Sequence, residues 1–211
     1  MSILQSLPSA AETPIGRFQS ALLVIAHPDD ETLFFLPTLQ GLQAAGTRVA
    51  ILCLSTGNAD GMGSVRTEEL RAACNVLNVA SEDLEVVDHP GLQDGRGNRW
   101  SPYLILPVVT AAIGKHSAEV VITFDAWGVS GHPNHVAVSE AIRIYALLAA
   151  QSQPDEHVPL QPPQTWVLET TSCWRKFAGP LDVLWAAQWV WFRWLYLWAS
   201  RYTYVNTLAR L

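Results

Sequence analysis

The chain has 211 residues, of which 49% are hydrophobic, and this is enough for one domain with a sizeable buried core. A formal net charge of -6 and a pI near 5.4 provide no basic field for a phosphate backbone, so a nucleic-acid partner is not expected. The few, scattered cysteines argue against a disulfide framework and against a thiolate metal cluster. They are Cys53, Cys74 and Cys173.

Short apolar runs predict strands of a parallel sheet that are buried on both faces. The runs occupy residues 21–26, 49–54, 84–87 and 120–124, and a last strand is expected at 165–169. Helical patterns at 68–77 and 136–150 lie between or after them. This alternation predicts an α/β fold, a three-layer, Rossmann-like, mostly parallel sheet with helices on both faces. Ligands of such sheets collect at the carboxyl ends of the strands.

The other segments divide the chain into three parts. Residues 1–20 form an N-terminal extension, which lacks the apolar run of a signal peptide or a membrane span. Residues 21–170 form the α/β domain, in which the proline-rich stretch 151–164 is expected to be an exposed connector. Residues 171–211 form a Trp-rich, cationic C-terminal segment that we expect to be a helical tail.

A dense polar cluster, His27-Pro28-Asp29-Asp30-Glu31, follows the first predicted strand directly. Four ionisable groups in five residues are costly to crowd together without a cation. An imidazole and a carboxylate are ligands that suit zinc, and the proline stiffens the turn between them. The alternative is a solvated acidic turn without a ligand.

A second cluster, Gly131-His132-Pro133-Asn134-His135, follows the strand predicted at 120–124 and opens a helix. The proline suits a first helical turn, and the two histidines are three residues apart, so both can face the same side. Matching histidines at the ends of two parallel strands favour a shared site over two unrelated structural histidines.

Two histidines and one carboxylate would leave a fourth position for water, the pattern of catalytic zinc. The spacing does not decide which histidine binds the metal. Asp29 and the other histidine remain for chemistry: a carboxylate can take a proton from water as it attacks a carbonyl carbon, and an imidazolium can stabilise the oxyanion. Iron is an alternative to zinc in such a ligand set.

Together, these two clusters resemble the LmbE-like, or PIG-L, family of metal-dependent de-N-acetylases. The resemblance implies that His27, Asp30 and His135 bind one Zn²⁺ ion. It also implies that Asp29 acts as general base and later as acid towards the departing amine. His132 is implied as the group that stabilises the oxyanion.

Within that family the chain is most similar to eukaryotic members, through Leu54–Asn58, Thr123–His132 and Trp191–Tyr196. This similarity implies hydrolysis of the acetamide of a glycolipid, N-acetylglucosaminyl-phosphatidylinositol, in the synthesis of glycosylphosphatidylinositol anchors. A deacetylase of a soluble N-acetylglucosamine conjugate and a non-catalytic metal-binding subunit are the alternatives.

Three further residues are candidates for the site. Arg66 lies where family members contact substrate and could bind phosphate or sugar oxygens, or it could be an exposed cation at a helix start. Asp94, in a turn-rich loop, is a sugar-binding candidate, with a turn former as its alternative. Asp125 ends a strand near the second cluster and is expected to orient His132 or a zinc-binding histidine.

The C-terminal segment predicts contact with a membrane surface. Seven of the nine tryptophans fall between Trp166 and Trp198, and residues 171–211 carry five Lys or Arg against one acidic residue. The apolar stretch is too short to span a bilayer, and tryptophan with arginine suits the membrane interface. A helix buried against the sheet or in an oligomer contact is the alternative. The family resemblance implies the cytoplasmic face of the endoplasmic reticulum membrane, with a soluble cytoplasmic location as its alternative.

Overall fold

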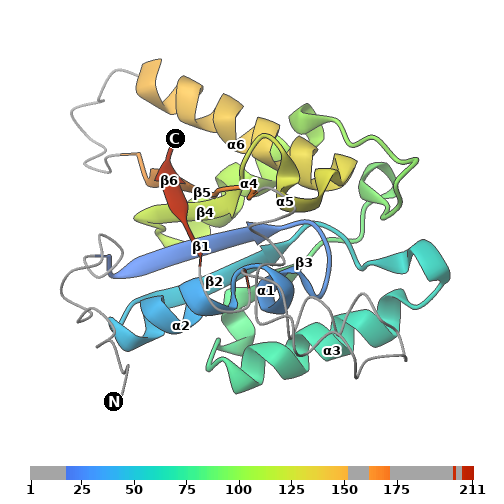
Figure 1. Ribbon diagram of the computed structural model, residues 1–211, viewed down its shortest axis with the longest axis horizontal. Coiled ribbons are helices and arrows are strands. Elements are labelled where there is room, and N and C mark those ends of the chain that lie inside the picture. Colours follow the sequence, from blue (N-terminus) through green and yellow to red (C-terminus); the bar gives the residue numbers. More distant parts are fainter. Residues whose placement is uncertain (1–17, 152–161, 172–201, 203–205) are drawn as a thin grey trace, which may run out of the picture.

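The computed structural model describes residues 18–151, 162–171, 202 and 206–211. Six strands form one sheet in the order β3-β2-β1-β4-β5-β6 (Figure 1). Neighbouring strands are parallel, except that β6 is antiparallel to β5. The strands are β1 (Ser20–Ile25), β2 (Arg48–Cys53), β3 (Leu84–Val86), β4 (Val120–Phe124), β5 (Gln164–Leu168) and β6 (Leu208–Arg210). The expected parallel sheet is confirmed, and each expected strand overlaps an observed one.

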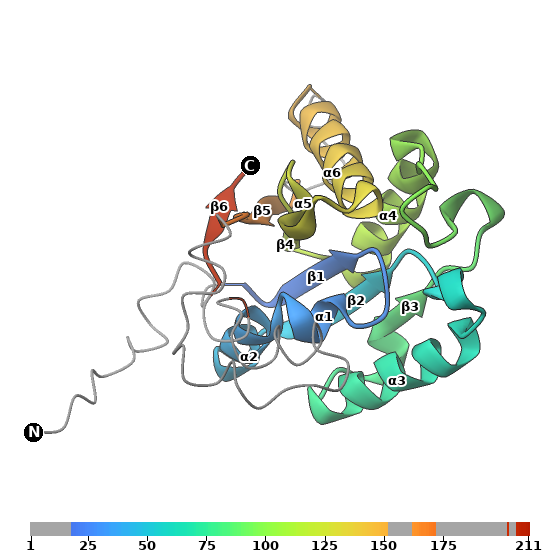
Figure 2. The ribbon, with the colours of Figure 1, turned by 45° about the vertical axis from the view of Figure 1, so that its right-hand side comes forward.

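Helices cover both faces of this sheet and make three layers (Figures 1 and 2). One face carries α2 (Leu36–Ala44) and α3 (Gly63–Val76), and the other carries α4 (Pro102–His116) and α6 (Pro133–Gln151). Short helical turns α1 (Asp30–Leu33) and α5 (Gly128–Gly131) follow β1 and β4. The 3₁₀ turns are η3 (Asn58–Asp60), η4 (Ser81–Asp83) and η5 (Pro90–Leu92).

The core lies around the central strands because these are covered by helices on both sides. Five successive residues of β1, from Ala21 to Ile25, are at most 2% exposed, and all five residues of β4 are buried. Such strands read as continuous apolar runs, which is why the sequence predicted them. Their carboxyl ends meet at one edge of the sheet, called here the carboxyl edge.

The elements absent from the sequence prediction include α4 and β6. Helix α4 contains Pro107 and several β-branched residues, which weaken a helical signal in the sequence. Strand β6 is only three residues long, and its pairing with β5 extends the sheet beyond the domain end expected at residue 170.

The C-terminal residues also contact the start of the domain. The side-chain amide of Asn206 donates to the carbonyl oxygen of Phe34 at 2.7 Å, and its oxygen accepts from the hydroxyl of Thr38. Tyr202 is 1% exposed, and its ring lies edge-on to Phe34. These residues therefore connect the end of the chain to the turn that follows β1.

No helix within the described residues is both long and apolar enough to cross a membrane. Most of the Trp-rich segment, expected as a helical tail, lies outside the described residues, at 172–201.

Candidate active site

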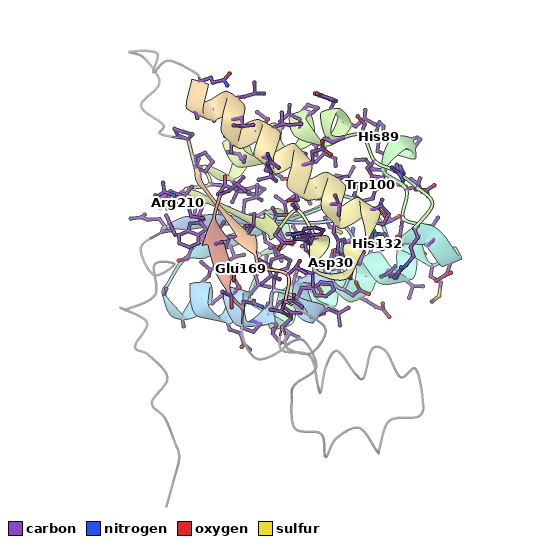
Figure 3. The ribbon with its side chains drawn as sticks, turned by 45° about the horizontal axis from the view of Figure 1, so that its top comes forward. Asp30, His89, Trp100, His132, Glu169 and Arg210 are labelled. Atoms are coloured by element: carbon purple, nitrogen blue, oxygen red, sulfur yellow. The ribbon has the colours of Figure 1, made fainter. Side chains whose placement is uncertain are left out.

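The topology brings the two polar clusters together. Strands β1 and β4 are parallel neighbours, so the cluster that follows β1 and the cluster that follows β4 meet at the carboxyl edge. Figure 3 shows Asp30, Trp100 and His132 on the same side of the molecule, away from Arg210. The predicted meeting of the two clusters is therefore observed.

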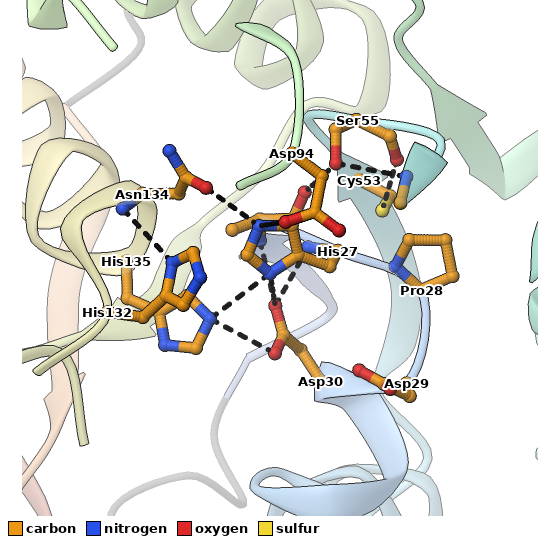
Figure 4. Close-up of polar contacts among 12 residues, drawn as sticks. His27, Pro28, Asp29, Asp30, Cys53, Ser55, Asp94, His132, Asn134 and His135 are labelled. Carbon is orange, nitrogen blue, oxygen red and sulfur yellow. Dashed lines mark hydrogen bonds and ion pairs between the residues drawn. The ribbon is translucent and has the colours of Figure 1, made fainter. Parts of the chain in front are cut away.

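Three side-chain atoms converge at this site (Figure 4). His27 Nδ1 and His135 Nε2 are 3.3 Å apart, and His135 Nε2 is 3.3 Å from Asp30 Oδ1. Asp30 Oδ2 lies 3.8 Å from His27 Nδ1. Ligand atoms on a tetrahedral zinc ion lie about 3.3 Å apart, given zinc bonds of about 2.0–2.1 Å. The His27, Asp30 and His135 set therefore fits such an ion.

His132 also lies close enough to belong to a metal site. Ligand atoms of His27, His132 and His135 all lie within 4.8 Å of one another, so the three histidines form a second candidate ligand set. Asp30 lies at 3.3 and 3.8 Å from the histidine nitrogens, so the carboxylate and His132 are both placed to serve as a third ligand.

The backbone fixes the Asp30 carboxylate. Its Oδ2 accepts hydrogen bonds from the amides of Ala26 at 3.1 Å and His27 at 2.9 Å. Burial opposes ionisation of Asp30, but His135, His27 and the His27 amide outweigh it and lower the pKa of Asp30. The carboxylate is thus kept anionic, as a metal ligand must be.

Asp29 has a strained backbone with φ 105°, in the left-handed region that non-glycine residues rarely adopt. Its amide donates to Glu31 Oε2 at 3.0 Å, which helps to hold this conformation. Burial raises the pKa of Glu31 to about 7. Glu31 therefore has a local supporting role that its place in the acidic cluster had not indicated.

Asp94 contacts His27, the first candidate metal ligand. Its Oδ1 lies 3.1 Å from His27 Nε2, and Asn134 Oδ1 lies 3.0 Å from the same nitrogen. Burial lowers the pKa of His27, but the hydrogen bond to Asp94 and the charge of Asp30 outweigh it and raise the pKa overall. With both partners on Nε2, Nδ1 faces the metal position, an arrangement that orients histidine ligands in metalloproteins.

Arg66 is directed into the protein. Its guanidinium donates to Asp29 Oδ2 at 2.9 Å, to Asp94 Oδ2 at 3.3 Å and to the carbonyl oxygens of Pro28 and Gly57. Arg66 and Asp94, expected to bind substrate, thus contact each other and the first cluster. Sequence spacing could not indicate this, because the contacts join three separate loops.

His132 is neutral at neutral pH. Burial and the nearby His27 and His135 imidazoles lower the pKa of His132 to about 4. Its Nδ1 accepts a hydrogen bond from the Asn134 amide at 3.3 Å, so Nε2 carries the proton. The Nε2–H remains available to donate, and the role of His132 in stabilising an oxyanion stays a prediction.

Asp125, expected to orient His132 or a zinc-binding histidine, contacts Thr170, two residues after the end of β5. The Asp125 carboxylate accepts from the amide and hydroxyl of Thr170, each at 2.6 Å. The Thr170 hydroxyl accepts from the Val129 amide at 2.9 Å. Asp125 therefore braces the turn around Gly128, whose carbonyl oxygen bonds His135 Nδ1 at 3.0 Å.

Two residues near the metal position were not identified from the sequence. Asn134 contacts His27 and also donates to the carbonyl oxygen of Asn98 at 2.8 Å. The buried ring of Trp100 lies edge-on to His27, with ring centroids 5.8 Å apart. The place of Asn134 between two histidines was the available signal, whereas Trp100 is brought in only by the fold of its loop.

A Rossmann-like sheet with histidines and carboxylates converging at its carboxyl edge defines an α/β protein with a candidate metal centre. The family described as GlcNAc-PI de-N-acetylase (PIG-L) matches residues 22–146. The chain belongs to this family.

Individual relatives agree with this membership. The chain is 38% identical over 183 residues to a probable N-acetylglucosaminyl-phosphatidylinositol de-N-acetylase of Schizosaccharomyces pombe, covering 84% of this chain and 69% of the relative. It is 31% identical over 228 residues to the de-N-acetylase of that name from Bos taurus, covering 95% and 87%.

Among solved structures, the fold is similar to N,N'-diacetylchitobiose deacetylase from Pyrococcus horikoshii, with a TM-score of 0.58 and 18% identity. The match covers 74% of this chain and 62% of that one.

Proposed function

We propose that this protein hydrolyses the acetamide of N-acetylglucosaminyl-phosphatidylinositol to acetate and glucosaminyl-phosphatidylinositol, in the synthesis of glycosylphosphatidylinositol anchors. The observation that carries the proposal is the convergence of His27 Nδ1, Asp30 Oδ1 and His135 Nε2 beside a general-base candidate. Membership of the family and the names of the relatives support the choice of substrate.

The metal in this proposal is Zn²⁺, held by His27, Asp30 and His135. When bound, zinc supplies a Lewis acid that polarises a carbonyl group and lowers the pKa of water. The two imidazoles and the carboxylate match the ligands that zinc takes in catalytic sites.

The protein's own groups then move the protons. Asp29, oriented by Arg66, takes a proton from the water that attacks the acetamide carbon, and later gives a proton to the departing amine. The Nε2–H of neutral His132 donates to the developing oxyanion. Water and amide are consumed, and acetate and amine are formed.

The proposed location is the cytoplasmic face of the endoplasmic reticulum membrane. The glycolipid named for the relatives supports a membrane location. The Trp-rich segment is one proposed contact with that membrane.

The test is release of free amine from N-acetylglucosaminyl-phosphatidylinositol by the zinc-loaded protein, beside a lipid-free N-acetylglucosamine glycoside. We expect turnover of the lipid, loss with a chelator and recovery with zinc. Asp29→Asn should reduce kcat by about 10²–10⁴-fold, and Glu140→Gln, an exposed carboxylate on α6 outside the contacts described for the site, serves as control.

Other outcomes would select another function. Equal or better turnover of the glycoside would favour the deacetylase of a soluble conjugate. Turnover of neither compound by a protein that binds zinc would favour the non-catalytic subunit.

A further inference from the structure

The metal-binding candidates are nearly buried, and the position that they surround is called here the recess. His27, Asp30 and His135 are 6%, 2% and 3% exposed, although they lie at the edge of the sheet. Segments that follow β2, β3 and β4 lie around them: Arg66 contacts Asp29, Trp100 contacts His27, and His132 lies beside both candidate histidine ligands. A substrate must pass these segments to reach the ligand atoms.

Large apolar side chains stand exposed on the same three segments. Two are at the start of α3, two are at the start of α4, and one caps α5. We call this set the rim: Met62 (50% exposed), Val65 (47%), Tyr103 (73%), Leu104 (41%) and Trp127 (74%). Helices α3 and α4 run back from the carboxyl edge, so their first turns lie at that edge, on the right of Figure 1.

The composition of the rim matches a membrane interface. Within the described part of the chain, Tyr103 and Trp127 are the exposed large aromatic residues, and both lie on the rim. Such rings are favoured at the level of lipid headgroups. Arg96 and Arg99 are exposed on the loop before α4 and could approach lipid phosphates. Asp60 and Asp88 offset their charge, so apolar contact is the larger contribution.

The short distance between the acetamide and the lipid in the substrate requires the site to lie close to the membrane. In N-acetylglucosaminyl-phosphatidylinositol, only the sugar ring, the inositol ring and the phosphate separate the acetamide from the diacylglycerol. A short head group can reach a recessed site from a bilayer only if the surface around the opening meets that bilayer.

We propose that the rim docks on an anionic phospholipid bilayer and presents the recess to the lipid head group. This inference rests on the proposed function for its substrate. It assigns membrane contact to described residues at the site, separate from the Trp-rich segment.

The test compares rim variants with control variants at exposed apolar residues outside the rim, towards the ends of α3 and α6. Tyr103→Ser and Trp127→Ser, singly and together, remove the rim aromatics. Val76→Ser, at the end of α3, and Leu147→Ser, towards the end of α6, remove side chains that are 81% and 56% exposed. Binding to phosphatidylcholine vesicles containing phosphatidylinositol is measured by co-sedimentation, and turnover is measured on vesicle-embedded substrate and on the lipid-free glycoside.

We expect the double rim variant to bind these vesicles on the order of tenfold more weakly and to lose kcat/KM on the embedded substrate in proportion. Turnover of the glycoside and the melting temperature should match those of the control variants.

Three results would overturn the proposal: unchanged vesicle binding in the double variant, an equal loss in the controls, or wild-type protein that does not bind the vesicles. The last result would direct attention to a protein partner for the rim. Absence of turnover by wild-type protein would contradict the proposed function alone, because vesicle binding is measured without catalysis.

Discussion

His135 Nδ1 donates a hydrogen bond to the carbonyl oxygen of Gly128 at 3.0 Å. A carbonyl oxygen can only accept, so Nδ1 carries the proton and Nε2 presents its lone pair to the metal position. The ring also stacks on Phe124, with centroids 4.1 Å apart and an interplanar angle of 2°. One ligand is thereby fixed in both tautomer and orientation.

The Gly128 carbonyl depends in turn on Asp125 and Thr170. The turn is strained at Val129, whose φ of 60° is rarely adopted by a β-branched residue. We expect Thr170→Val and Asp125→Asn to weaken zinc affinity about 10–100-fold, measured by competition with a chelator. Thr110→Val, at an exposed site on α4, is the control. An unchanged affinity with a lowered melting temperature would show that the contact is only structural.

A substitution of Arg66 can distinguish two roles that the sequence left open: positioning of other site residues and contact with the substrate. If it holds Asp29 and Asp94, Arg66→Lys should lower kcat on the order of a hundredfold with little change in KM, because lysine cannot make the same forked contacts. A higher KM with unchanged kcat would instead indicate a substrate contact. Arg71→Lys, an exposed arginine paired with Glu68 on α3, is the matched control.

The outer strand β3 should give the protein a pH-dependent stability through Glu85. Partial burial opposes ionisation of Glu85, but His116 at 2.7 Å and Lys115 at 3.1 Å outweigh it and lower the pKa of Glu85. A pKa that is lower in the folded state stabilises the protein above the ordinary value of 4.5, and this stability is lost as pH falls through the folded value.

We therefore expect Glu85→Gln to be less stable than wild type at pH 6, with the difference shrinking below about pH 4.5. Urea unfolding at several pH values measures this. Glu140→Gln, an exposed glutamate on α6, is the control. A difference that grows on acidification would contradict the assignment.

The buried thiols should be unreactive in the folded protein. Burial raises the pKa of Cys74 to about 12, and it raises the pKa of Cys53 as well. In a Cys173→Ser variant, both thiols should react with an alkylating reagent at pH 8 only as fast as the protein opens. The same variant in guanidinium, where both thiols should react at once, is the control. Rapid labelling of the native variant would argue against this packing.

Much of the fold could be predicted because the central strands are buried on both faces and read as apolar runs. The two ligand clusters could be predicted because each follows such a strand. The contacts of Arg66, Asp94 and Asp125 could not, because each depends on how a separate loop folds back onto the carboxyl edge. Pro107 in α4 and the brief β6 show the other limit, since tertiary packing outweighs weak local signals.

The bonds from Asn206 to Phe34 and Thr38 have a consequence for synthesis on the ribosome. The candidate ligands, from His27 to His135, are translated well before Asn206 and β6, which complete the sheet and brace the turn after β1. A nascent chain thus carries every candidate ligand before the contacts that brace the turn after β1 can form. We therefore expect stable metal binding to require the emergence of Asn206 and β6 as well as that of the candidate ligands.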